Sequence, residues 1–422
     1  MTRQRKVVLL VCDGLGRDWL SAEHTPNLMV LREESAALEQ YAAVFPSVTR
    51  VSAASIATGC LPGNHGLHGN QMALSSGAGL SVHNAGLPGF RDLMRAATGK
   101  TLNVPTMAEY LAERGGQSVY SNVSPGAAYF LDPEHYGTVF HRSGSFGPGG
   151  VPILDERHLA VTHDLAGDEK SVERFCADFV QNKTGVLSIV WLANPDLTLH
   201  YHPLGSEAHV IALKHTDRLA GRIVDLIRAA REQEDVLLIV CSDHGHEVIS
   251  GSVHLGRWLA LRGLESELAQ GHIVVAGQGT SALIYATAVG RPKLAEIFDE
   301  LKSEPWCGRL FQGEELTQLG FARVAEVVAA VDMARTSQVN EYGVSGARWM
   351  VEDGESSIEM GCGQHGGLGP QETRPFCLLN HAKIPSIFVD ARTELIDLAP
   401  TILTFLEVPF EPMDGRSLLQ NL

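Results

Sequence analysis

The chain has 422 residues, of which 44% are hydrophobic, and a formal net charge of −16. This length is sufficient for one large α/β domain with an insertion. The acidic balance argues against nonspecific binding of a nucleic acid polymer, which requires a basic surface, but it does not exclude a phosphate substrate, because bound cations invert the local charge. The seven cysteines are scattered without a C-x-x-C pair and predict no disulfide framework.

The first predicted element is a strand in RKVVLLVC, residues 5–12, which leads into Asp13 and Gly14. Its apolar run of five residues is too short for a signal peptide, and no small-residue cleavage site follows. No run in the sequence approaches transmembrane length. We therefore expect a cytoplasmic protein without a membrane partner.

A candidate nucleophile lies in FPSVTRVSAASIATG, residues 45–59. The small residues after Pro46 favour a short helix that stops at Gly59, with Thr49 at or near its first turn. Backbone N–H groups and the positive end of the helix dipole would favour an anion or an alkoxide there. Beside a divalent cation the pKa of the Thr49 hydroxyl would fall, which would make it an attacking group. A plain helix cap is the alternative interpretation of Thr49.

Three predicted elements follow in the middle of the chain. A helix begins at a capping box of Thr106 and Glu109, stops at Gly115 and precedes a strand. The glycine-rich stretch 129–151 predicts a loop, in which His141 and Arg142 are more often solvated than in contact with substrate. Residues 206–233 carry one apolar stripe and predict a long helix that leads into the next strand.

Acidic and imidazole side chains gather where predicted strands end. TGVLSIVWLANPDLTLH brings Asp196, with His200 four residues later, and DVLLIVCSDHGHE brings Asp243 and His244. GCGQHGGLGPQE places His365 in a glycine-rich loop. An aspartate at a strand end is often only a turn former or helix cap. Because open α/β sheets collect ligands at the carboxyl ends of their strands, these groups together with Asp13 predict a site for two divalent ions. Mixed oxygen and nitrogen ligands suit zinc, and also manganese or iron.

These motifs, taken in order, resemble the alkaline phosphatase superfamily, in its nucleotide pyrophosphatase/phosphodiesterase and phosphonoacetate hydrolase branch. The matching segments CDGLG, FPSVTRVSAASIATG, HGLHGN, NPDLTLHYH, SDHG and GQHGG span nearly the whole chain. The resemblance implies an α/β fold with a mixed, mostly parallel central sheet flanked by helices. Strand and helix patterns after His246 suggest a smaller inserted α+β cap, so we expect a catalytic core in residues 1–246 and 346–422 and a cap in residues 247–345.

The resemblance also implies roles for individual residues. Thr49 would attack phosphorus and form a phosphothreonine intermediate, and the side-chain amide of Asn70 would hold a nonbridging oxygen of the substrate. The cofactors would be two divalent ions, zinc first and manganese or iron as alternatives. The implied ligands are Asp196, His200 and His365 for one ion, and Asp13, Thr49, Asp243 and His244 for the other.

The expected substrate is a small-molecule phosphoric ester. Sulfatases are discounted because CLPGN at Cys60 lacks their arginine, and cofactor-independent phosphoglycerate mutases because they use serine where this chain has Thr49. A phosphonoacetate-type C–P hydrolase stays an alternative, although VYSNVSPGAAYFLDP, residues 119–133, lacks the expected lysine.

Two further questions stay open at the level of sequence. Arg50 either contacts a phosphate oxygen and favours monoesters or is a solvated helix residue. A noncatalytic, metal-stabilised binding protein is disfavoured by Thr49 and Asn70, since a structural metal site is closed and needs no hydroxyl. A homodimer is compatible with the sequence.

Overall fold

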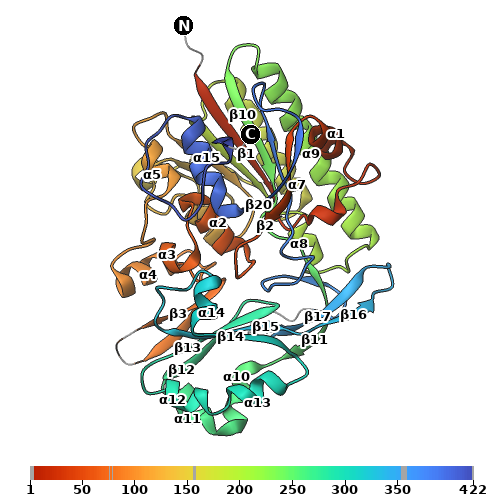
Figure 1. The fold of residues 1–422 in the computed structure, drawn as a ribbon. Helices are drawn as coiled ribbons and strands as arrows, with labels where there is room; N and C mark the ends of the chain where they lie inside the picture. The colour runs from red at the N-terminus through yellow and green to blue at the C-terminus, as the bar shows by residue number, and fades with distance from the viewer. Residues whose placement is uncertain (1–3, 76, 78, 155–157, 353–358, 421–422) are drawn as a thin grey trace.

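The structure is a computed structural model that describes residues 4–75, 77, 79–154, 158–352 and 359–420. Figure 1 shows an α/β core, with a smaller body of strands and short helices next to it. The structure confirms the predicted fold class, because the central sheet is mixed and mostly parallel and has helices on both faces.

The central sheet has ten strands, and β1 lies in its middle. Both neighbours of β1, β9 and β10, run parallel to it, whereas β19 runs antiparallel to β10. Helices cover both faces, which explains why these strands are nearly continuous apolar runs. In sheet order the strands are β20 (Ile387–Glu394), β2 (Ala36–Ala42), β19 (Cys377–Asn380), β10 (Asp235–Cys241), β1 (Arg5–Cys12), β9 (Leu187–Leu192), β5 (Gln117–Ser121), β6 (Thr138–His141), β7 (Phe146–Gly147) and β8 (Val151–Pro152).

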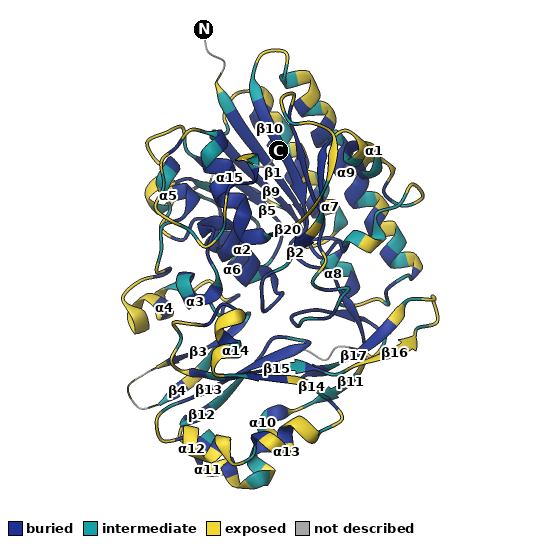
Figure 2. Ribbon diagram, viewed as in Figure 1, coloured by how far each residue is buried: buried dark blue, intermediate teal, exposed yellow. Residues whose placement is uncertain are grey.

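Two hydrophobic clusters hold the helices against the two faces of this sheet. Figure 2 shows the central strands buried between them. One face is covered by α2 (Thr49–Thr58), α5 (Met107–Leu111), α6 (Pro125–Phe130) and α15 (Leu398–Phe405), and the other by α1 (Pro26–Glu33), α7 (Leu165–Val180) and α9 (Glu207–Ala230). Shorter helices of the core are α3 (Pro62–His65), α4 (Phe90–Thr98) and α8 (Asp196–Leu199).

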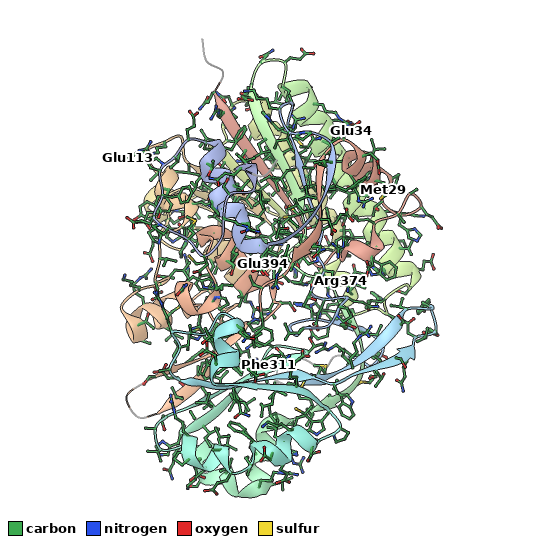
Figure 3. The ribbon with its side chains drawn as sticks, in the orientation of Figure 1. Met29, Glu34, Glu113, Phe311, Arg374 and Glu394 are labelled. Carbon is green, nitrogen blue, oxygen red and sulfur yellow. The ribbon has the colours of Figure 1, made fainter. Side chains whose placement is uncertain are left out.

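The smaller body, which we call the cap, contains two four-stranded sheets. Phe311 of β14, labelled in Figure 3, lies with its ring 6.5 Å from that of Phe45 and so joins cap to core. One sheet has the order β12 (Ile273–Gly277), β13 (Ser281–Ala286), β15 (Val327–Met333), β14 (Cys307–Gln312), and the other β16 (Arg335–Val339), β17 (Ser345–Val351), β11 (Glu247–Val253), β18 (Gly363–Gln364). The cap helices are α10 (Leu255–Leu259), α11 (Glu265–Ala269), α12 (Arg291–Ala295), α13 (Phe298–Ser303) and α14 (Glu314–Gln318), and the hairpin β3 (Gln71–Ser75) and β4 (Leu80–Asn84) contacts β12.

Several predicted elements are found where the sequence placed them. Thr106 caps α5 by accepting a hydrogen bond from the backbone of Glu109, and the predicted long helix is α9. The expected cap, residues 247–345, holds most strands of the two cap sheets, while β17 begins at its last residue; its boundaries stay a prediction. Within the described residues, no helix has both the length and the hydropathy needed to cross a bilayer.

The prediction of a loop over 129–151 is wrong. This stretch contains β6, which pairs parallel to β5 and buries His141. The His141 Nε2 atom lies 2.9 Å from the carbonyl oxygen of Val123, and Arg142 donates to the same oxygen. The glycines suggested a loop, but they lie outside β6, whose pairing with β5 is a tertiary contact that the local pattern does not show.

Candidate metal centre

The carboxyl ends of β1 and β10 bring two buried carboxylates together. Asp13 follows β1 directly, and its Oδ2 accepts a hydrogen bond of 3.0 Å from Trp191 Nε1. Asp243 lies two residues beyond β10, and its Oδ1 accepts from the backbone N–H of Gly14 at 3.2 Å. These bonds leave Asp13 Oδ1 and Asp243 Oδ2 facing His244 Nε2, at 3.4 and 3.2 Å.

Thr49 is the first residue of α2, as the sequence predicts, and its Oγ1 lies 3.2 Å from His244 Nε2. The other ring nitrogen of His244, Nδ1, is 3.0 Å from the carbonyl oxygen of Gly245. A carbonyl oxygen only accepts, so we assign the proton to Nδ1 and the lone pair to Nε2. Nε2 is therefore available to a cation or to the Thr49 hydroxyl.

A second group surrounds Asp196. The sequence predicts that its strand runs up to Asp196, but β9 ends at Leu192 and a turn with a cis peptide before Pro195 leads to Asp196 at the start of α8. Asp196 Oδ1 lies 3.3, 3.0 and 3.3 Å from the Nε2 atoms of His200, His246 and His365.

The two groups adjoin each other. The rings of His244 and His365 stack with their centroids 3.7 Å apart. His365 is oriented from behind, because its Nδ1 lies 2.8 Å from the carbonyl oxygen of Ser47, two residues before Thr49. The glycine-rich loop that carries His365, the start of α2 and the carboxyl ends of β1 and β10 therefore meet at one point.

The arrangement of donor atoms fits divalent cations. In these two groups, four of the described buried atoms have no hydrogen-bond partner: Asp13 Oδ1, Asp243 Oδ2, Asp196 Oδ1 and His246 Nε2. Leaving such groups buried and unpaired is costly, whereas a cation would satisfy all of them. The potential ligand atoms fall into two sets, each within 4.8 Å, namely Asp196, His200, His246 and His365, and Asp13, Asp196 and His244.

The electrostatics favour the same interpretation. Burial raises the pKa of Asp13 well above its usual range, and the neighbouring carboxylates add to that rise. Burial and then Asp196 raise the pKa of Asp243 to about 7. Burial also acts to raise the pKa of Asp196, but the nearby imidazoles outweigh it and hold that pKa well below normal. Burial lowers the pKa of His244. A buried, crowded set of carboxylates and imidazoles is the environment that bound divalent ions stabilise.

A cavity of about 550 Å³ opens beside these groups and is lined by Thr49, Arg50 and Asn70. Arg50 is half-buried, and its Nη1 donates to the backbone oxygen of Asn70 at 2.9 Å and its Nε to Ser124 Oγ at 3.3 Å. A Cβ atom on Gly86 would lie 2.4 Å from Arg50 Nη2, so the guanidinium packs closely against residue 86. Arg50 is thus part of the cavity wall and not a solvated helix residue.

The structure brings the predicted site residues together around this cavity. Sequence reasoning missed His246, Ser124 and Gln278; the last two line the cavity, and Gln278 Oε1 accepts from the backbone N–H of Asn70. The signal for His246 was its place two residues after His244 in SDHGHE. The predicted site residues that the structure places here are Asp13, Thr49, Arg50, Asn70, Asp196, His200, Asp243, His244 and His365.

The fold and the site define an α/β protein of the alkaline phosphatase superfamily. Within it, the chain belongs to the type I phosphodiesterase / nucleotide pyrophosphatase family, whose model matches residues 7–317.

The chain is similar to several ectonucleotide pyrophosphatase/phosphodiesterases at low sequence identity. The chain is 22% identical over 255 residues to ectonucleotide pyrophosphatase/phosphodiesterase family member 7 of Mus musculus; the match covers 59% of this chain and about half (51%) of that relative. Murine ectonucleotide pyrophosphatase/phosphodiesterase 5 has a similar fold, with a TM-score of 0.69 at 18% identity over 99% of each chain. An inactive threonine-to-alanine variant of that murine protein in complex with AMP gives a TM-score of 0.68 at 19% identity, over 98% of this chain and 97% of that one. The human protein gives 0.66 at 16% identity, over 97% of each chain.

Proposed function

We propose that this protein is a metal-dependent hydrolase of phosphoric esters that uses Thr49 as its nucleophile. The observation that carries the proposal is the Thr49 hydroxyl, which lies at the first residue of α2 and 3.2 Å from His244 Nε2, at the edge of the cavity. Membership of the type I phosphodiesterase / nucleotide pyrophosphatase family supports it.

The proposed metal ligands are those that the sequence predicts. Asp13, Thr49, Asp243 and His244 would hold one divalent cation, and Asp196, His200 and His365 the other. When bound, such cations neutralise phosphoryl charge and stabilise the attacking and leaving oxygens. Zinc suits the mixed carboxylate and imidazole donors, and manganese or iron are the alternatives.

Thr49 and Asn70 have distinct tasks in the proposed reaction. Thr49 Oγ1 forms a bond to phosphorus while the bond from phosphorus to the leaving oxygen breaks, and the hydroxyl proton ends on the departing alcohol or in solvent. Water then adds to phosphorus, the bond to Thr49 breaks, and the threonine hydroxyl is restored. Asn70 Oδ1 accepts from the backbone N–H of Arg50 at 3.4 Å, which assigns the Asn70 amide N–H₂ as donor to a nonbridging oxygen.

The proposed substrate is a nucleotide-like phosphodiester or pyrophosphate. The AMP complex of the murine protein supports this class, and a cavity of about 550 Å³ is within the usual size range for small-molecule sites. Arg50 brings a cation to the cavity wall, and we propose that it contacts a phosphate oxygen of substrates with more than one negative charge.

The test of the nucleophile is Thr49→Ala. We expect loss of turnover of bis-p-nitrophenyl phosphate and of a p-nitrophenyl nucleotide diester, with two metal ions per chain still measured by elemental analysis. Ser52→Ala is the matched control, because Ser52 is buried in the same helix and its hydroxyl has no hydrogen-bond partner. Full activity of Thr49→Ala would overturn the assignment.

Two further assays complete the test. EDTA should inactivate the wild-type protein, and zinc or manganese should restore its activity. Phosphonoacetate and p-nitrophenyl phosphate belong in the same panel, since preferential turnover of phosphonoacetate would replace the ester substrate by the alternative, C–P bond hydrolysis.

A further inference from the structure

His246 is a buried histidine whose two ring nitrogens both face oxygen acceptors. Its Nε2 lies 3.0 Å from Asp196 Oδ1, and its Nδ1 lies 3.3 Å from the carbonyl oxygen of Gly14. A neutral imidazole carries one proton, so one of the two contacts always sets a nitrogen lone pair against an oxygen lone pair. If Nδ1 donates to Gly14, the conflict falls at Nε2, where neither Nε2 nor Asp196 Oδ1 has a hydrogen-bond partner.

The ring has little freedom to turn away from this conflict. Gly14 has a φ of +69°, and a Cβ atom there would lie 2.4 Å from His246 Cε1 and 2.8 Å from Asp196 Cβ. The residue that follows is the first of β11, Glu247, which is buried and accepts from Arg335 Nε at 3.1 Å. His246 is therefore wedged between the turn after β1 and the beginning of the cap.

A cation removes the conflict, because it accepts the lone pairs of nitrogen and carboxylate oxygen together. The Nε2 atoms of His200 and His365 lie equally close to Asp196 Oδ1, and all four residues offer ligand atoms within 4.8 Å of one another. We propose that His246 is a fourth protein ligand of the ion held by Asp196, His200 and His365. This inference rests on the metal dependence proposed above.

The two ions would then sit in unlike sites. One site has three imidazoles and one carboxylate, whereas the other has the two carboxylates of Asp13 and Asp243, the His244 imidazole and the Thr49 hydroxyl. Imidazole nitrogen favours borderline ions such as zinc, and oxygen ligands favour harder ions such as manganese. Each site then has four protein ligands, but the neutral Thr49 hydroxyl is a weaker ligand for zinc than an imidazole nitrogen. We expect the imidazole-rich site to release its ion last and to prefer zinc over manganese.

The experiment is a chelator titration of the full chain loaded with zinc, with bound metal measured by elemental analysis. The wild-type protein should lose its two ions in two separate steps. In His246→Gln the affinity of the protein for the more tightly held ion should fall by more than roughly 100-fold. This loss exceeds the usual effect of losing an outer-shell partner. Cobalt loading gives a second readout, since loss of one nitrogen ligand should change the visible absorption of the tighter site.

Glutamine separates a ligand from a positioning residue. Its side-chain amide still donates a hydrogen bond to Asp196, so a histidine that only orients Asp196 would be replaced with a small shift and an unchanged cobalt spectrum, and that result would overturn the proposal. His209→Gln is the matched control, because His209 is equally buried but offers no atom to either ligand set. Its two-step release should match the wild type.

Failure of the inference and failure of the proposed function give different results. A single release step in the wild-type protein, with turnover that still requires Thr49 and metal, refutes the role of His246 alone. A wild-type protein without metal-dependent turnover refutes the proposed function. Near-UV circular dichroism of each metal-free variant verifies that its fold is intact.

Discussion

At the scale of single residues, His65 is a buried imidazole that bridges two segments beside the cavity. Its Nδ1 accepts from the backbone N–H of Leu67 at 3.1 Å, so its Nε2 carries the proton and donates to Ser55 Oγ, also at 3.1 Å. Ser55 lies on α2, the helix that begins with Thr49. Burial lowers the pKa of His65 to about 3, because a charged ring would be desolvated and would lose the bond from Leu67.

This histidine should make the protein sensitive to acid. Between about pH 6.5 and 3 the unfolded chain binds a proton at His65 that the folded chain does not, so stability falls as the pH falls through that window. Going from pH 7 to pH 5, the wild-type protein should lose about 2 kcal/mol more unfolding free energy than His65→Asn. Urea unfolding at the two pH values measures the difference. The exposed His254→Asn should behave as wild type, and an equal loss in His65→Asn would contradict the prediction.

Arg50 allows a second test at this scale. If the Arg50 guanidinium contacts the substrate, Arg50→Ala should lower kcat/KM more for a dianionic substrate than for a monoanionic one. The reason is that the lost charge-assisted hydrogen bond is stronger for the doubly charged group. We expect kcat/KM to fall by roughly 10-fold or more for p-nitrophenyl phosphate and less for bis-p-nitrophenyl phosphate. Arg32→Ala, on α1, should change neither value. Equal losses for both substrates would assign Arg50 to the support of Asn70 and Ser124 only.

At the scale of secondary-structure elements, α7 fixes the turn that carries Asp196, a proposed metal ligand. Asp168, in the first turn of α7, accepts hydrogen bonds from the backbone N–H groups of Ala193 and Asn194 at 2.9 and 3.1 Å. It also accepts from the side-chain amides of Asn194 and Asn122, at 2.8 and 3.0 Å. This carboxylate therefore holds the turn between β9 and α8, and with it the direction of Asp196.

Asp168→Asn should loosen that turn, because an amide has one acceptor oxygen where the carboxylate has two. The amide N–H₂ would face N–H donors that now donate to the second carboxylate oxygen. Asp196 would then be misplaced. We expect kcat to fall by roughly 10- to 100-fold, the usual effect of removing a partner behind a metal ligand, together with weaker metal retention by elemental analysis. Glu173→Gln, on an exposed part of α7, should leave both measurements unchanged. Wild-type metal content and kcat in Asp168→Asn would show that the turn holds without the carboxylate.

At the scale of the whole molecule, a buried ion network joins the cap to the loop that carries His365. Arg348 of β17 forms ion pairs with Asp332 of β15 and with Glu372, the latter at 3.1 Å. Glu372 in turn accepts from the backbone N–H groups of Gly367 and Gly369, at 3.0 and 2.8 Å. The cap thus contributes to the metal centre through the loop that it holds.

Removal of the Arg348 guanidinium should destabilise the protein strongly. Arg348→Met leaves the buried Glu372 and the half-buried Asp332 without their partner, and breaking a buried pair costs about 3 to 5 kcal/mol. The change should appear in the urea midpoint, and adding Glu372→Gln should recover part of the loss because one unpaired charge is then gone. Arg218→Ala, which breaks an exposed pair with Glu169, should cost less than about 1 kcal/mol. A similar cost for both arginines would mean that the network contributes little.

The sequence allowed the fold class and most residues of the candidate metal centre to be predicted, since both depend on local patterns. Asp13, Asp243 and His244 follow apolar strands, and that position alone brings them to one edge of a parallel sheet. His246 has the same local setting, but only the turn of Gly14 and the approach of Asp196 show where its ring points. The strand at His141 was missed for a similar reason, because its pairing with β5 is a tertiary contact.

The order of the central sheet also bears on how the chain is made. β2 lies between β19 and β20, whose residues come more than three hundred positions later in the sequence. A growing chain on the ribosome therefore carries β2 without either neighbour until more than three hundred further residues have been added. His365 precedes β19, so the proposed metal centre gains its last histidine shortly before β19 is made. Interrupted translation should thus leave fragments that have an unpaired, aggregation-prone strand and an incomplete metal centre.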